Sequence, residues 1–231
     1  MPILDEKTIA SLHERLSGRL PGPVELRLYR RPDTGRLALP PGVGCRTCAA
    51  AEELAGALVE AASGIISLEV IDVSATPDSP VRDVPTLTVG TPGSEHRIRF
   101  QGLPIGYEFA VLLDAVERVS SSDPGLRPEH VEQLSTLPQV TELLVFVTPN
   151  CSYCPAASAM ANRMALADSN FRSIVVEANE FPELSDQFGV QGVPQTVVNR
   201  SAIFVGALPP AAFVERVLQL VGGDRERASP N

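Results

Sequence analysis

The stretch ELLVFVTPNCSYCPAA, residues 142–157, places two cysteines directly after a hydrophobic, β-branched run and directly before a series of helix formers. The run at 142–148 is typical of a central strand covered on both faces. Residues 156–168 favour a helix. Cys151 and Cys154 are therefore predicted to lie at a junction between a strand and a helix.

The same cysteine spacing occurs once more, at Cys45 and Cys48 in GVGCRTCAAA (residues 42–51), and the two pairs use all four cysteines of the chain. The two pairs lie 106 residues apart. A Val-Pro dipeptide follows each pair, and the two dipeptides are offset by 109 residues: Val84-Pro85 and Val193-Pro194.

A third pair of matching segments is RFQGLPIGYEFAVLLDAV (99–116) and IFVGALPPAAFVERVLQLV (203–221), in which equivalent Phe and Gly residues are 104 residues apart. Landmarks that recur in one order at nearly one offset indicate two copies of one unit. The period is too long for a solenoid repeat, so each copy is predicted to be a domain. The segment 120–128, with its Ser, Pro and Gly, marks the connection. The predicted domains are residues 1–122, with CRTC, and 123–231, with CSYC.

Hydrophobic periodicity in the second copy predicts alternating helices and strands followed by a hairpin. The predicted helices are 128–137, 156–168, 181–189 and 210–221, and the predicted strands are 142–148, 173–179, QTVVN and AIFVG. A strand, a helix and a strand in succession imply a parallel crossover, and the hairpin adds antiparallel strands. The predicted fold class is therefore α/β, with two tandem units that are each a mixed β-sheet between helices.

Length and charge restrict the function. A chain of 231 residues is sufficient for two domains that each bury a core. The net charge of -9 argues against nucleic acid or an anionic membrane surface as a partner. No segment approaches the roughly 20 apolar residues of a membrane span, and the N-terminus does not resemble a secretory signal. The expected location is the cytoplasm, where a Cys-x-x-Cys is more often catalytic or metal-binding than a structural disulfide.

Several segments carry a family resemblance: LLVFVTPNCSYCP, NEFPELSDQFGVQGVPQTVVN and FVGALPPAAF in the second unit, and CRTC, DVPT and FQGLPIGYEF in the first. In combination they resemble the thioredoxin superfamily, and most of all its protein disulfide oxidoreductases, which are glutaredoxin-like chains of two tandem thioredoxin folds. The resemblance covers nearly the whole chain. It implies a redox-active Cys-x-x-Cys in each unit.

The resemblance also assigns substrate-binding residues. It implies that Val193-Pro194 is a cis-proline loop that lies against the dithiol, keeps metal away and offers the backbone of Val193 to an extended substrate. Val84-Pro85 stands at the equivalent place in the first unit. Tyr153, between the cysteines, is similar to the tyrosine of glutaredoxin-like sites.

Thiol–disulfide exchange fits this pattern on physical grounds. Only a thiolate attacks a disulfide, and an ordinary cysteine with a pKa near 8.5 is mostly protonated at neutral pH. The free N–H groups and the positive dipole end of a helix N-terminus favour the thiolate. We therefore expect Cys151 to attack a substrate disulfide and Cys154 to resolve the mixed disulfide, with Cys45 and Cys48 as a second dithiol.

The two copies differ in front of the first cysteine. Cys151 lies three residues beyond Thr148, whereas Cys45 lies 15 residues beyond Arg30, the end of the predicted strand. The additional residues, within RPDTGRLALPPGVG, could shield the site, form part of a substrate groove, or mean that the strand is misplaced. A redox-silent or purely structural role for Cys45 and Cys48 is the alternative interpretation.

The sequence leaves the proton-transfer group unassigned. No acid occurs in Leu143–Pro149 or in Leu26–Arg31, which take up most of the predicted strands before the two motifs. Glu177 and Glu180 come later, and we interpret them as a solvated strand end. The three histidines are expected to be exposed: His13, His96 and His130.

The remaining alternatives concern metal, cofactor and partner. A Cys₄ zinc site shared by the two pairs would need a much shorter separation, of about 15–20 residues, so we expect no metal. No phosphate-binding motif occurs, so we expect no nucleotide cofactor and only the cysteine pairs as redox groups. Expected partners are disulfide-containing or dithiol proteins, and the family suggests a thioredoxin reductase-like flavoprotein as electron donor. Two other functions stay open: a single-dithiol relay for a peroxidase, similar to part of alkyl hydroperoxide reductase systems, and a non-catalytic peptide-binding module.

Overall fold

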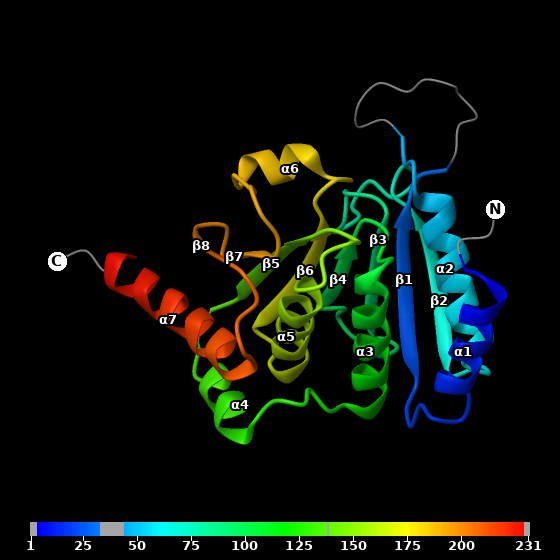
Figure 1. Cartoon of the computed structure of the whole chain (residues 1–231), viewed down its shortest axis with the longest axis horizontal. Helices are drawn as coiled ribbons and strands as arrows, with labels where there is room; N and C mark the ends of the chain where they lie inside the picture. Colours follow the sequence, from blue (N-terminus) through cyan, green and yellow to red (C-terminus); the bar gives the residue numbers. More distant parts are fainter. Residues whose placement is uncertain (1–3, 33–43, 138, 229–231) are drawn as a thin grey trace.

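A computed structural model describes residues 4–32, 44–137 and 139–228, with side chains described as far as residue 222 (Figure 1). The first half contains α1 (Glu6–Leu16), β1 (Val24–Arg30), α2 (Cys48–Ala61), β2 (Ile66–Asp72), β3 (Thr86–Gly90), β4 (Ile98–Gln101) and α3 (Tyr107–Ser121). The second half contains α4 (Pro128–Ser135), β5 (Thr141–Val147), α5 (Cys154–Ala167), β6 (Phe171–Glu177), α6 (Pro182–Gln187), β7 (Gln195–Val198), β8 (Ala202–Val205) and α7 (Pro210–Ala228).

The strands form one mixed sheet of eight strands in the order β2-β1-β3-β4-β6-β5-β7-β8. Each half has the same arrangement, because β1 pairs in parallel with β2 and antiparallel with β3, and β5 does the same with β6 and β7. In each half the last two strands form an antiparallel hairpin, β3 with β4 and β7 with β8, and a helix follows. The repeat in the sequence is thus a repeat of topology, and the predicted α/β class with two mixed-sheet units is confirmed.

The local predictions agree with the structure to within a few residues, except that the last helix, predicted over 210–221, is α7, Pro210–Ala228. The strand expected before Cys45 is β1, so the longer segment after Arg30 does not result from a misplaced strand. Residues 33–43, which make up most of that segment, lie outside the described residues, so its predicted shielding or groove role stays a prediction. The predicted boundary after residue 122 falls between the end of α3 and the start of α4, and it also stays a prediction.

The hydrophobic core is continuous across the two halves. Alternate residues of each strand point to opposite faces of a sheet. In β5, Leu143 and Val145 join a large cluster with α1, α2, α3, α5 and α7, whereas Leu144 and Phe146 join a smaller cluster with Phe188, beyond α6. Figure 1 shows α3 and α5 side by side on the same face of the sheet. The two halves therefore share a core, contrary to the expectation that each buries its own.

Parallel pairing of β4 with β6 joins the halves, with Phe100 opposite Val175. Directly after β4, Gly102 has φ 97°, and its N–H donates to the carbonyl oxygen of Pro85 at 2.8 Å. Gly206 has φ 100° and makes the same 2.8 Å bond to Pro194 in the second half. The positive φ explains why glycine recurs at this place in both copies.

Alanine substitutions at Gly102 and Gly206 distinguish the effect of backbone strain from the effect of packing between the halves. A Cβ at Gly102 would lie 2.7 Å from the Cβ of Glu177, whereas a Cβ at Gly206 would meet no atom within 4 Å. We expect Gly206→Ala to lower the free energy of unfolding by about 1–2 kcal/mol, from the φ strain alone. Gly102→Ala should cost about 1–3 kcal/mol more, because the junction is overpacked. Urea denaturation measures both; equal losses would contradict tight packing at the junction.

Candidate functional site: two cysteine pairs and the acids between them

The second cysteine pair lies where β5 leads into α5. Cys151 and Cys154 form a disulfide with Cα atoms 5.4 Å apart, and Cys154 is the first residue of α5. Cys154 is fully buried, whereas Cys151 is partly exposed. The backbone N–H of Cys154 is directed at the Sγ atom of Cys151, with an N···S distance of 3.1 Å. Because an N–H at a helix N-terminus stabilises a thiolate, Cys151 is both the accessible and the better stabilised sulfur of the pair.

The predicted substrate-binding residues of this unit lie around Cys151. The carbonyl oxygen of Val193 is 3.7 Å from the Sγ atom of Cys151. The peptide bond between Val193 and Pro194 is cis, as the resemblance implies. Tyr153, between the two cysteines in the chain, has 72% of its surface exposed. The structure therefore brings the sulfur of Cys151 and the backbone carbonyl of Val193 together and leaves Tyr153 open to solvent.

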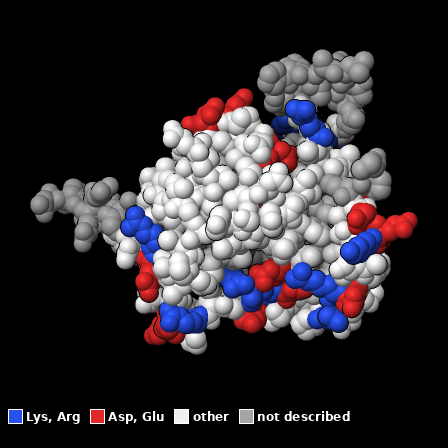
Figure 2. Space-filling model, viewed as in Figure 1, with Lys and Arg blue, Asp and Glu red and all other residues white. Residues whose placement is uncertain are grey.

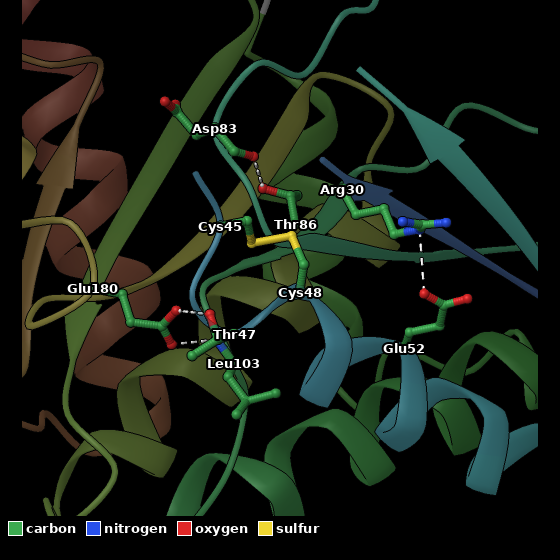
Figure 3. Close-up of a disulfide and its surroundings, with 9 residues drawn as sticks. All are labelled: Arg30, Cys45, Thr47, Cys48, Glu52, Asp83, Thr86, Leu103 and Glu180. Carbon is green, nitrogen blue, oxygen red and sulfur yellow. Dashed lines mark hydrogen bonds and ion pairs between the residues drawn. A yellow bond between two sulfur atoms is a disulfide. The ribbon is translucent and has the colours of Figure 1, made fainter. Parts of the chain in front are cut away.

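The first cysteine pair lies at the N-terminus of α2 (Figure 3). Cys45 and Cys48 form a disulfide with Cα atoms 5.5 Å apart, and Cys48 is 4% exposed. The Val84-Pro85 bond of this unit is also cis. Its two neighbours in the chain, Asp83 and Thr86, lie beside the disulfide in Figure 3, where the Thr86 hydroxyl donates to the Asp83 carbonyl at 2.6 Å. Both units thus place a cis Val-Pro bond next to a cysteine pair.

The prediction that Glu177 and Glu180 form a solvated strand end is wrong for Glu177, which is buried, whereas Glu180 is partly exposed. Glu177, at the end of β6, is 7% exposed and accepts hydrogen bonds from Asn179 Nδ2 at 2.8 Å and from the N–H of Glu180 at 2.7 Å. Burial raises the pKa of the Glu177 carboxyl. Glu180 accepts hydrogen bonds from the N–H of Leu103 at 2.7 Å and from the hydroxyl of Thr47. The physical reason is the pairing of β4 with β6, which lays one half of the chain over these acids.

Glu108 is a buried acid to which no motif in the sequence pointed. It is 3% exposed on α3, and neither carboxyl oxygen has a hydrogen-bond partner among the described residues. Burial raises its pKa to about 7, and the Ser158 hydroxyl opposes the rise. That hydroxyl donates to the carbonyl oxygen of Cys154 at 3.2 Å. Burial thus brings the pKa of this carboxyl close to neutral pH.

A signal for Glu108 is nonetheless present in the sequence. The acid stands four and seven residues before Leu112 and Ala115, which are both buried on α3. This spacing places it on the apolar face of the helix. An acid on a buried helix face is a candidate for a shifted pKa, because burial disfavours the charged form.

The prediction that the histidines are exposed is wrong for two of them. His96 is 5% exposed, with Nδ1 2.8 Å from Thr88 Oγ1 and Nε2 3.1 Å from Glu25 Oε2. Burial lowers its pKa. His130 is 4% exposed on α4, whereas His13 is exposed as predicted. The buried histidines belong to the packing of the sheet and of α4, and neither forms part of the cysteine sites.

Comparison with known proteins identifies the fold. Residues 141–219 match the thioredoxin domain family. The structure also aligns with a protein disulfide oxidoreductase from Aeropyrum pernix K1, with a TM-score of 0.82 and 27% identity over 96% of each chain. The chain has a tandem thioredoxin fold. Each thioredoxin-fold unit carries a Cys-x-x-Cys at the start of a helix, as the resemblance in the sequence implies.

The alkyl hydroperoxide reductase AhpF is the second kind of relative. The Pseudomonas aeruginosa protein is 25% identical over 115 residues, which are 50% of this chain and 22% of that protein. The chain thus spans about a fifth of the length of the curated relatives that it matches. The NTD_N/C domain of AhpF from Enterococcus faecalis shares the tandem thioredoxin fold, with a TM-score of 0.77 and 19% identity over 93% of this chain and 99% of that one.

The surface shown in Figure 2 carries both signs of charge. Basic and acidic side chains are interspersed near the lower edge, whereas the area above α3 and α5 is mostly uncharged. Among the described residues, no helix has the length and apolar character that crossing a membrane requires. The same part of the chain contains no cluster of three or more His, Cys, Asp or Glu that could hold a metal ion.

The raised pKa of Glu108 predicts a pH-dependent stability. Its pKa is about 7 in the folded chain, against an ordinary value of 4.5, so the folded state binds more protons between these pH values. The contribution of Glu108 to stability is complete below pH 4.5 and is lost as the pH rises through 7. We expect the difference in unfolding free energy between wild type and Glu108→Gln to change by about 3 kcal/mol from about pH 4.5 to about pH 8.

Urea denaturation at several pH values measures this difference. Glu60→Gln, on the exposed side of α2, is the matched control and should follow the wild type. A difference between wild type and Glu108→Gln that stays constant with pH would show that Glu108 is not buried in its neutral form.

Proposed function

We propose that the protein is a thiol–disulfide oxidoreductase that acts on protein disulfides and dithiols, with Cys151 as nucleophile and Cys154 as resolving cysteine. One observation carries the proposal. The accessible Cys151 sulfur receives a helix N-terminal N–H and stands 3.7 Å from the carbonyl oxygen of Val193, while Cys154 is buried behind it. The surroundings of Cys151 favour its thiolate form, and the sulfur of Cys154 is shielded from solvent.

The proposed reduction has two steps. The Cys151 thiolate attacks one sulfur of a substrate disulfide, the substrate S–S bond breaks, and the departing thiolate takes up a proton. Cys154 then loses its proton and attacks the Cys151 sulfur, which releases the second substrate thiol. The substrate gains two electrons and two protons, and the enzyme is left as the Cys151–Cys154 disulfide. The reverse order of steps oxidises a dithiol.

Substrate binding follows from the surroundings of Cys151. An extended segment can donate a backbone N–H to the carbonyl of Val193, next to Pro194, and pack against the exposed ring of Tyr153. Val84 and Pro85 offer the equivalent backbone in the first unit. Recognition through the main chain predicts broad tolerance for substrate side chains.

A reducing cycle needs a dithiol donor to restore the cysteines. We propose a thioredoxin reductase-like flavoprotein for this role and a cytoplasmic setting for the activity, where thiol exchange contributes to redox homeostasis. Nucleic acid and membrane are not among the proposed partners, because the net charge is -9.

The similarity to the alkyl hydroperoxide reductase AhpF favours a second candidate function. In this alternative, only one dithiol is active and passes electrons to a peroxidase. A non-catalytic peptide-binding role is the third candidate. The three candidates differ in turnover: the first reduces general protein disulfides with multiple turnovers, the second requires a dedicated acceptor, and the third needs no cysteine.

Serine variants of the two nucleophile positions test the proposal. We expect Cys151→Ser to lower the rate of insulin reduction, with dithiothreitol as donor, by roughly tenfold or more, because the attacking thiolate is lost. Cys45→Ser should retain a substantial part of the rate. Cys151→Ser and Cys45→Ser make the same substitution at equivalent positions, one in each unit. Equal losses would show that the sites are ranked wrongly, and a wild type without turnover would remove the enzyme proposal.

A further inference from the structure

Glu180 connects the C-terminal unit to the CRTC motif of the N-terminal unit. Its Oε1 atom accepts the N–H of Leu103 at 2.7 Å, and its Oε2 atom accepts the hydroxyl of Thr47 (Figure 3). Thr47 lies between Cys45 and Cys48, and Figure 3 shows the carboxylate next to this disulfide. An acid from one unit is therefore held against the redox site of the other.

The carboxylate occupies the N-terminal end of α2. Thr47 is the N-cap residue of α2, and its side chain makes no capping bond to the helix, because the hydroxyl is turned to Glu180. The first turn of α2 contains no acid of its own. The positive end of the helix dipole thus acts on a carboxylate as well as on the sulfur of Cys45, and the two negative groups compete for it.

The position of Glu180 is fixed from both sides. Its backbone N–H donates to Oε2 of the buried Glu177 at 2.7 Å. The Cα of Gly102 packs so close that an added Cβ would lie 3.2 Å from Oε1 of Glu180. A side chain that is held through its backbone and its two carboxyl oxygens cannot move away from the motif without breaking these contacts.

Other charged groups around the motif are paired or point elsewhere. Arg30 on β1 forms an ion pair with Glu52 on α2, at 3.2 Å. Arg46 is exposed. Asp83 contacts Thr86 through its backbone carbonyl, beside the disulfide. Glu177 is linked to the motif through Glu180 and accepts hydrogen bonds of its own.

We propose that Glu180 is a positioning residue for the Cys45/Cys48 dithiol: it holds the CRTC motif against the C-terminal unit and makes this dithiol more reducing than it would be without the carboxylate. The physical reason is that a nearby anion disfavours the thiolate. The reduced form loses stabilisation, the disulfide is favoured, and the reduction potential falls. In the second unit the residue that corresponds to Thr47 is Tyr153, which is exposed. The effect of the Glu180 carboxylate is therefore proposed for the Cys45/Cys48 dithiol and not for the second site.

The test isolates the first site with the changes Cys151→Ser and Cys154→Ser in the full-length chain. The fraction of reduced Cys45 and Cys48 is measured in dithiothreitol redox buffers by maleimide labelling, and the pH dependence of iodoacetamide alkylation reports the Cys45 thiolate. For Glu180→Gln we expect the equilibrium constant to shift about tenfold towards the dithiol, which corresponds to about 30 mV. The alkylation midpoint should fall by about one pH unit.

Two further variants define the cause. Glu183→Gln removes a charge from an exposed position three residues along the same segment and should match the wild type. Thr47→Val keeps the charge but removes the hydrogen bond that holds it, so its shift should have the same direction and a smaller size than that of Glu180→Gln. In the background with Cys45→Ser and Cys48→Ser, Glu180→Gln should leave the potential of the second site unchanged.

The inference is overturned if Glu180→Gln and Glu183→Gln give the same potential and the same alkylation midpoint, even where Glu180→Gln lowers stability. Such a result would make Glu180 a purely structural contact. The inference rests on the proposed redox function, but these readings need neither a protein substrate nor turnover. Failure of insulin reduction counts against the proposed function, whereas an unchanged potential in Glu180→Gln counts against this inference.

Discussion

The parallel pairing of β4 with β6 is the constraint on which the rest of the structure depends. It joins two four-stranded sheets into one, and it aligns the C-terminal end of β4 with that of β6, where Gln101 is opposite Val176. The residues that follow these two strands must then run side by side. For this reason Leu103 meets Glu180, and Gly102 lies against Glu177. These contacts between the two halves are consequences of one strand register.

The same junction explains why Glu177 is buried and why Glu180 is only partly exposed. If the second unit stood alone, Glu177 and Glu180 at the end of β6 would be exposed to water, which would solvate their charges. Docked against the first unit, they are kept by hydrogen bonds from backbone N–H groups and from Asn179 and Thr47. Glu108 has no such partners among the described residues, and burial raises its pKa to about 7.

The two units share one fold, but their cysteine pairs have different electrostatic surroundings. Each has a cysteine pair at a helix N-terminus and a cis Val-Pro bond, and each stabilises that Val-Pro segment by a glycine N–H. The residue before the second cysteine differs: Thr47 contacts a carboxylate, whereas Tyr153 extends into solvent. A tandem protein can in this way hold two dithiols of unlike properties on one fold, because the difference lies in side chains around the motif and not in the motif spacing.

The sequence by itself determined the duplicated unit, the order of its strands and helices, the place of both cysteine pairs at helix starts and the Val-Pro segments beside them. The elements and the repeat are encoded locally, in hydrophobic period and in motifs that recur at one offset. The place of the Val-Pro segments beside the cysteines is what the resemblance to the thioredoxin superfamily implies. Only the tertiary structure decided what covers the acids at the end of β6. Glu177 and Glu180 look like solvent-exposed residues in their own segment, and Glu108 differs from its helix neighbours only by lying on the apolar face. The burial of Glu177 and the contacts of Glu180 are set by residues far away in the chain, because the register of β4 against β6, and not local polarity, determines what lies over them.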